Sequence, residues 1–74
     1  MNQLGKKRSR LGAFLDNQEI TQNDAAMRAG VNKETMSKLC NDDEYVPTFR
    51  TISKIMKTIR EIKPEANVSD FFNI

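Results

Sequence analysis

Hydrophobic residues recur along this chain at spacings of three and four, the period of a helix that buries one side. The longest such stripe lies in the second half of the chain and consists of Phe49, Ile52, Ile55, Met56, Ile59 and Ile62. Thr48 before it is a favoured N-cap residue, and Pro64 after it marks the end of the helix. A shorter stripe, Leu11, Phe14 and Leu15, predicts a first helix over residues 6–17. No segment shows the alternation typical of a strand, so the pattern predicts an all-α fold.

The middle of the chain has the pattern of two short helices joined by a tight turn. Thr21 and Asn32 are favoured N-cap residues, which predicts one helix over residues 22–29 and a second over 33–40. Gly30 lies between them, where one helix must end and the next begin within about three residues, and glycine tolerates the positive φ this needs. The inward positions are Ala25, Ala26, Ala29, Met36, Leu39 and Cys40. A glycine turn followed by a helix with a polar outer face is typical of a DNA-reading helix-turn-helix.

The remaining segments complete a small helical domain. Residues 41–47 (NDDEYVP) contain turn formers and a proline, so we expect a loop there. Ser69 and Asp70 predict a short final turn or helix that packs the apolar residues Phe71, Phe72 and Ile74. We therefore expect one compact domain of four to five helices over residues 1–74, with its helix-turn-helix at about 21–40.

Composition excludes several classes of function. The chain has no histidine and one cysteine, Cys40, so a disulfide, a tetrahedral zinc site and a Cys-His nucleophile pair all lack their parts. We therefore expect no enzyme activity, no metal and no cofactor. No apolar run approaches the roughly 20 residues that cross a bilayer, and the N-terminus lacks the apolar core of a signal peptide. We expect a cytoplasmic protein without a membrane partner.

The net charge of +2 is small, but charges of each sign occur in blocks along the chain. A basic face bordered by acidic patches would orient an approaching polyanion, although such blocks are also common on solvated helix surfaces. The first basic block consists of Lys6, Lys7, Arg8 and Arg10. Positive charge at a helix N-terminus opposes the macrodipole, so this cluster either serves another purpose or forms a charged tail.

A further set of positions carries a family resemblance. Gln22 is followed at fixed intervals by the small Ala26, by Gly30, and by the apolar Met36 and Leu39; Pro47, the aliphatic fourth helix and the terminal VSDFF follow in the same order. In this register the chain resembles the Cro/CI-type helix-turn-helix regulators, also called the XRE family, which include small phage and mobile-element repressors. The resemblance covers roughly residues 6–74 and implies a lambda-repressor-like DNA-binding fold.

The resemblance also implies which residues contact DNA. In such proteins the second helix of the motif, which corresponds to residues 33–40 here, lies in the major groove, where its outward side chains reach base edges. The matching base-contacting positions are Lys33, Glu34, Ser37 and Lys38. Either lysine could donate to guanine O6 and N7, and Glu34 could accept from cytosine N4. The matching phosphate-contacting positions are Gln22, Asn32, Thr48 and Arg50. The alternative for each is an ordinary exposed helix residue.

Two departures from the family pattern matter. Many relatives carry a buried arginine in the first helix paired with a glutamate after the reading helix, whereas the matching positions here are Leu15 and Cys40. Because replacing both charges avoids a stranded buried charge, we expect both residues to be buried and close together. The loop after the reading helix carries Asp42, Asp43 and Glu44, which would repel a DNA backbone. Tyr45 either offers its hydroxyl to a phosphate or packs against the fourth helix.

Two functions follow. The first is a sequence-specific DNA-binding transcriptional regulator, which we expect to be a repressor of phage or mobile-element origin. We expect its own level or a partner to control it, because the chain has no room for a ligand-sensing domain. Relatives usually bind double-stranded DNA operators as dimers. A candidate surface for such a homodimer consists of Phe71, Phe72 and Ile74. The simpler alternative is that these residues pack in the core. The second function is a protein-interaction module on the same scaffold, such as an antirepressor, an antitoxin or a host-factor binder.

Overall fold

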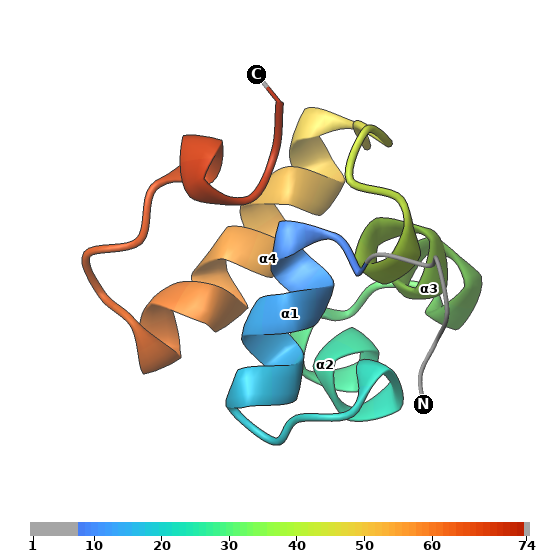
Figure 1. Cartoon of the computed structure of the whole chain (residues 1–74). Helices are drawn as coiled ribbons and strands as arrows, with labels where there is room; N and C mark the ends of the chain where they lie inside the picture. The colour runs from blue at the N-terminus through green and yellow to red at the C-terminus, as the bar shows by residue number, and fades with distance from the viewer. Residues whose placement is uncertain (1–7, 74) are drawn as a thin grey trace.

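The computed structural model describes residues 8–73 of the chain (Figure 1). The helices in chain order are α1 (Arg10–Asn17), α2 (Gln22–Ala29), α3 (Lys33–Asn41), α4 (Phe49–Ile62) and the 3-10 helix η1 (Val68–Asp70). No strand occurs in this described part, and the predicted all-α fold of four to five helices is confirmed. α3 packs against both α1 and α2, and α2 also packs against α4. None of these helices combines the length and apolar character that a bilayer span requires.

α1 begins at Arg10, later than the sequence pattern predicted, because Ser9 is its N-cap. The Ser9 hydroxyl accepts a hydrogen bond from the Gly12 amide at 2.9 Å and donates one to the Leu39 carbonyl. The Ser9 amide donates to the Cys40 carbonyl at 2.8 Å. These bonds stop the helix and fasten its start to the end of α3. The first two residues of the predicted helix lie outside the described residues.

The helix-turn-helix follows its predicted local signals. The Thr21 hydroxyl accepts from the Asp24 amide at 3.0 Å, and the Asn32 side-chain oxygen accepts from the Glu34 amide at 2.7 Å. Gly30 ends α2 in the left-handed region, at φ 70° and ψ 37°. Both N-caps and the glycine turn are therefore confirmed. α3 extends one residue beyond the predicted end at residue 40, an offset common at helix termini.

α4 begins after Thr48, whose hydroxyl accepts a hydrogen bond from the Thr51 amide at 3.3 Å. Its buried apolar residues are Ile52, Ile55, Met56 and Ile59. Phe49 was expected in the same stripe, but this expectation is wrong, since its side chain is 79% exposed. Phe49 is the first residue of α4 and lies one turn before the point where the helix meets the core. The helix therefore has a solvent-exposed aromatic side chain at its N-terminal end.

The C-terminal segment folds back onto the core. Phe71 and Phe72 are buried, and the Phe71 ring meets Phe14 edge to face with 5.3 Å between centroids. The core-packing alternative is therefore confirmed for these two residues, and the proposal that they form a surface for a second copy is wrong. Ile74, the third member of that surface, lies outside the described residues. η1 begins at Val68, one residue before the predicted start.

α1 and α3 pack closely where the family pattern would place a charged pair. Leu15 is 3% exposed and Cys40 is fully buried, and both belong to the same apolar cluster. Their predicted burial is therefore confirmed. Gly12 lies at the closest approach: a Cβ atom added there would collide with the Cys40 carbonyl oxygen. Only a glycine fits at this point without moving backbone.

Candidate nucleic-acid interface

α3 has one apolar and one polar side. Met36, Leu39 and Cys40 are buried, whereas Lys33, Glu34 and Lys38 are exposed and Ser37 is half-buried. This division follows from the helical period, because positions 36, 39 and 40 fall on one face. The structure therefore brings the four residues expected to contact bases onto the accessible part of one helix, which begins directly after the Gly30 turn.

Two of these four residues have neighbours within the chain. The Lys38 ammonium lies 5.8 Å from the centroid of the Tyr45 ring, a cation–π contact that holds the lysine toward the loop after α3. Tyr45 is itself half-buried against the core, which fits the packing role that was one of its two alternatives. Ser37 is met by the Asn41 amide, which donates to the Ser37 carbonyl at 3.0 Å.

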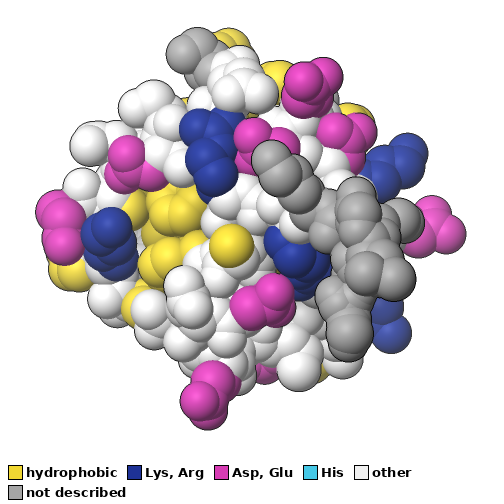
Figure 2. Space-filling model, viewed as in Figure 1, with side chains coloured by type: hydrophobic (Ala, Val, Ile, Leu, Met, Phe, Trp, Pro, Cys, Tyr) yellow, Lys and Arg dark blue, Asp and Glu magenta, His cyan; other side chains and the backbone are white. Residues whose placement is uncertain are grey.

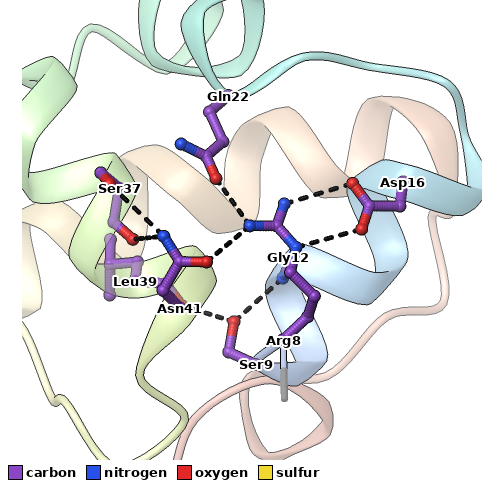
Figure 3. A network of polar contacts seen from close by, with 8 residues as sticks. All are labelled: Arg8, Ser9, Gly12, Asp16, Gln22, Ser37, Leu39 and Asn41. Atoms are coloured by element: carbon purple, nitrogen blue, oxygen red, sulfur yellow. Dashed lines mark hydrogen bonds and ion pairs between the residues drawn. The ribbon is translucent and has the colours of Figure 1, made fainter. Parts of the chain in front are cut away.

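The start of α2 carries the first expected phosphate contact, Gln22. Its side chain is half-buried and accepts a hydrogen bond from Arg8 Nη1 at 2.7 Å (Figure 3). The same nitrogen donates to Asn41 Oδ1 at 2.7 Å, and the other edge of the guanidinium pairs with Asp16. Gln22 therefore belongs to a polar network that joins the residue before the Ser9 cap and the last turn of α1 to the start of α2 and the end of α3.

The other expected phosphate contacts lie at helix starts. Asn32 and Thr48 are exposed N-cap residues, and their side-chain oxygens accept from backbone amides of α3 and α4. Arg50 is exposed in the first turn of α4 and makes no ion pair with any residue in 8–73. Helix N-termini favour anions through their unpaired amides and positive dipole end. Each of these positions is therefore chemically suited to bind a phosphate oxygen.

The acidic loop is less repulsive than its sequence indicated. The Asp43 carboxylate accepts from the Arg10 amide at 2.9 Å and pairs with the Arg10 guanidinium at 3.1 Å. Asp42 accepts from the Glu44 amide in a short turn, and both side chains remain exposed. Arg10 also reaches Asn73, which ties the loop to the C-terminal segment. Only part of the negative charge in this loop is thus matched by a neighbouring cation.

The basic N-terminal block also takes part in the fold. Arg8 and Arg10, its two described members, both form ion pairs within the chain. Figure 2 shows charges of both signs on the face that carries α1, with apolar side chains exposed in a hollow beside them. This view therefore shows no uniformly basic surface.

Sequence reasoning missed three residues near this site, Arg8, Ser9 and Asn41. Ser9 has a local signal, because serine is a preferred N-cap and the hydroxyl lies three residues before the amide it accepts from. Arg8 and Asn41 have no such signal, because Arg8 binds Gln22, 14 residues away in the chain, and Asn41, 33 residues away. Cys40 is close to this network but stays neutral: burial raises the pKa of its thiol, which outweighs the opposite influence of Arg8.

Comparison with known proteins agrees with this geometry. Residues 10–61 match the family model of the Cro/C1-type HTH DNA-binding domain, which covers well over half of the chain. No curated protein and no solved structure gives a significant match. The matched region begins with α1 and ends within α4, so it contains the capped helices, the glycine turn and the exposed face of α3. The chain therefore belongs to the Cro/C1-type helix-turn-helix family of DNA-binding domains.

Proposed function

We propose that this protein is a sequence-specific regulator of transcription, a repressor of phage or mobile-element origin that binds double-stranded operator DNA. The observation that carries the proposal is the exposed polar side of α3, where Lys33, Glu34 and Lys38 stand on a helix whose opposite side is fixed in the core. A helix held in this way can enter the major groove without exposing apolar residues.

Each contact has a defined role in this proposal. The two lysines of α3 donate to guanine O6 and N7, Glu34 accepts from cytosine N4, and Ser37 contacts a neighbouring base edge or phosphate. Phosphates are bound at the helix starts by Gln22, Asn32, Thr48 and Arg50. Base contacts set the preferred sequence, and phosphate contacts fix the register of the protein on the duplex.

Selection of bound sequences from a random DNA pool tests this proposal, and we expect a palindromic consensus. The logarithm of the binding constant should fall with log salt by about 0.9 for each phosphate that a lysine or arginine neutralises. Arg50→Ala should weaken binding to all sequences equally and reduce that slope by about 0.9. Failure to enrich any sequence would contradict the proposal.

Lys33→Ala and Lys38→Ala, singly and together, are expected to relax base preference while the fold is retained. Each lost base contact should cost about 1–3 kcal/mol on the preferred sequence and little on random DNA. Both side chains are exposed, so thermal unfolding should change little. Lys63→Ala, an exposed lysine at the other end of α4, is the control for loss of one positive charge. Unchanged preference in the double variant would mean that another element reads the bases.

We further propose that the protein binds its operator as a homodimer through the N-terminal end of α4. Phe49 is 79% and Val46 48% exposed, and Phe49 lines an apolar groove together with Ile52, Met56 and Val68. The groove also carries the charged residues Lys57, Arg60 and Glu61. An interface that contains both signs can pair with itself across a two-fold axis. Phe49 is flanked by two expected phosphate contacts, so a dimer here would lie beside the DNA.

Phe49→Ala is expected to weaken this dimer without adding a charge beside the DNA. The exposed ring would act as the apolar anchor, and losing such an anchor typically costs about 2 kcal/mol or more of binding free energy. Sedimentation of the protein with palindromic DNA and with half-site DNA would measure dimer assembly. The affinity for the half-site should be unchanged. Met27→Ala, at a residue 73% exposed on α2, serves as the control. Equal assembly of the Phe49 variant and the native protein would place the dimer surface elsewhere.

The protein-interaction module remains the second candidate because Asp42 and Glu44 are exposed directly after α3. Two carboxylates at this place suit a basic protein partner better than a phosphate backbone. The salt series separates the two functions, since a flat salt response or the absence of any DNA binding favours the protein partner.

A further inference from the structure

Arg8 lies at the junction of three helix ends and contacts residues from each of them. Its guanidinium has five N–H donors, and four are used by the described residues. Nε and Nη2 bind the two oxygens of Asp16 at 3.1 and 3.2 Å, which fixes the plane of the group. Nη1 then points between α2 and α3, where it donates to Gln22 and Asn41 at 2.7 Å each.

This arrangement determines which way two amide groups face. A guanidinium has no acceptor, so Gln22 and Asn41 must turn their oxygens toward it. Asn41 then directs its amino group to the Ser37 carbonyl on α3. In Figure 3 the Gln22 amino group points away from the guanidinium, and no residue in 8–73 accepts a hydrogen bond from it. Gln22 is therefore held with a donor presented at the start of α2.

We propose that Arg8 is a positioning residue for DNA binding, which holds the Gln22 amino group as a phosphate donor and fixes the start of α2 relative to the end of α3. The inference rests on the proposed function, since it needs a phosphate at α2. In this way the Arg8 side chain fixes the distance between the base-reading helix and the phosphate contact at Gln22. Arg8 acts through Gln22 and itself touches no base or phosphate in this scheme.

A double-mutant cycle between Arg8→Met and Gln22→Ala tests the proposal by operator affinity. Arg8→Met is expected to weaken binding about five- to ten-fold in the native background and less than two-fold in the Gln22→Ala background, because the effect passes through that side chain. The salt slope should not change. Arg8→Lys should behave like Arg8→Met, since an ammonium cannot reproduce the planar fork. Arg28→Met, which removes an exposed pair with Asp24, is the control and should leave affinity unchanged.

The free protein provides a second readout. The side-chain amide of Gln22 should be ordered by NMR relaxation in the native protein and mobile in Arg8→Met. If that variant does not fold, Asp16→Asn loosens the guanidinium with less disruption and should mobilise the Gln22 amide in the same direction.

Three results would overturn the inference: additive losses in the cycle, a salt slope reduced by about 0.9, which would mean that Arg8 binds a phosphate directly, or an unchanged Gln22 amide. Native protein that binds no DNA would instead contradict the proposed function. If the native protein binds DNA but with no higher affinity than the Arg8→Met variant, only this inference is contradicted and the proposed function stands.

Discussion

Gly12→Ala is expected to destabilise this protein by about 1–3 kcal/mol, although alanine is the better helix former. In an unobstructed helix the same change would stabilise by about 1 kcal/mol. Here the new Cβ would collide with the Cys40 carbonyl oxygen and press on the Arg8 side chain. The carbonyl cannot retreat freely, because it accepts the Ser9 amide at 2.8 Å.

The expected size follows from the atoms that must move. Overpacking a close contact costs about 1–3 kcal/mol, and loosening a backbone hydrogen bond adds about 1 kcal/mol. A chain of this length has a total stability of only about 4–11 kcal/mol, so the variant would lose a large part of it. The loss falls on the α1–α3 contact, which also carries the Arg8 network.

Urea unfolding of Gly12→Ala and of Ala13→Gly would measure the effect. Ala13 is the next residue of α1 and is exposed, so Ala13→Gly should lose only the helix preference of alanine, about 1 kcal/mol. The two variants change the same helix by the same methyl group in opposite directions. A Gly12→Ala protein more stable than the native one would show that α1 and α3 are not in close contact at this point.

The features that sequence predicted correctly depend on neighbouring residues. Thr21, Asn32 and Thr48 cap helices through amides two or three residues away, and Gly30 supplies a backbone conformation that glycine adopts readily. The buried face of α3 follows from helical period alone. Such signals are complete within one turn of helix, so a single sequence contains them.

The features that sequence missed depend on contacts between distant segments. Ser9 and Gly12 matter because the end of α3 packs against them, and nothing in residues 9–12 announces that partner. Glu19 ends α1 with φ 59°, where a glycine would have been the expected signal. Phe49 fitted the apolar period of α4 but lies beyond the core, since period gives the side of a helix that is buried and not how far burial extends.

The same limit applies to the candidate site. The polar residues of α3 and the helix starts were identified from the family register and their local capping chemistry. Arg8 was assigned to a basic block, whereas the structure uses it to orient Gln22 and Asn41. Position 15, where many relatives carry a buried arginine, is leucine here, whereas the partly exposed Arg8 places its guanidinium against Gln22 and Asn41. Loss of one charge pair and gain of another network can be recognised only when both are seen in space.

Leu15→Arg and Cys40→Glu should each destabilise the protein by about 3–5 kcal/mol, and together by clearly less than the sum. Leu15 is 3% exposed and Cys40 is fully buried, so either change alone places an unpaired charge in the core. Together they restore the charged pair that the family pattern places at these positions. The mutual attraction of the two groups should then recover about 2 kcal/mol or more, as coupled neighbours do.

Urea unfolding of the two single variants and the double variant at neutral pH gives this coupling energy. Leu15→Met is the control for side-chain shape, and without a charge it should cost less than about 1.5 kcal/mol. If the single variants are too unstable to fold, the double variant should still show a cooperative transition, because only the pair is compensated. Additive losses, or a double variant less stable than both single ones, would mean that Leu15 and Cys40 do not face each other across the α1–α3 contact, and the assignment of these positions to the family's charged pair would then be incorrect.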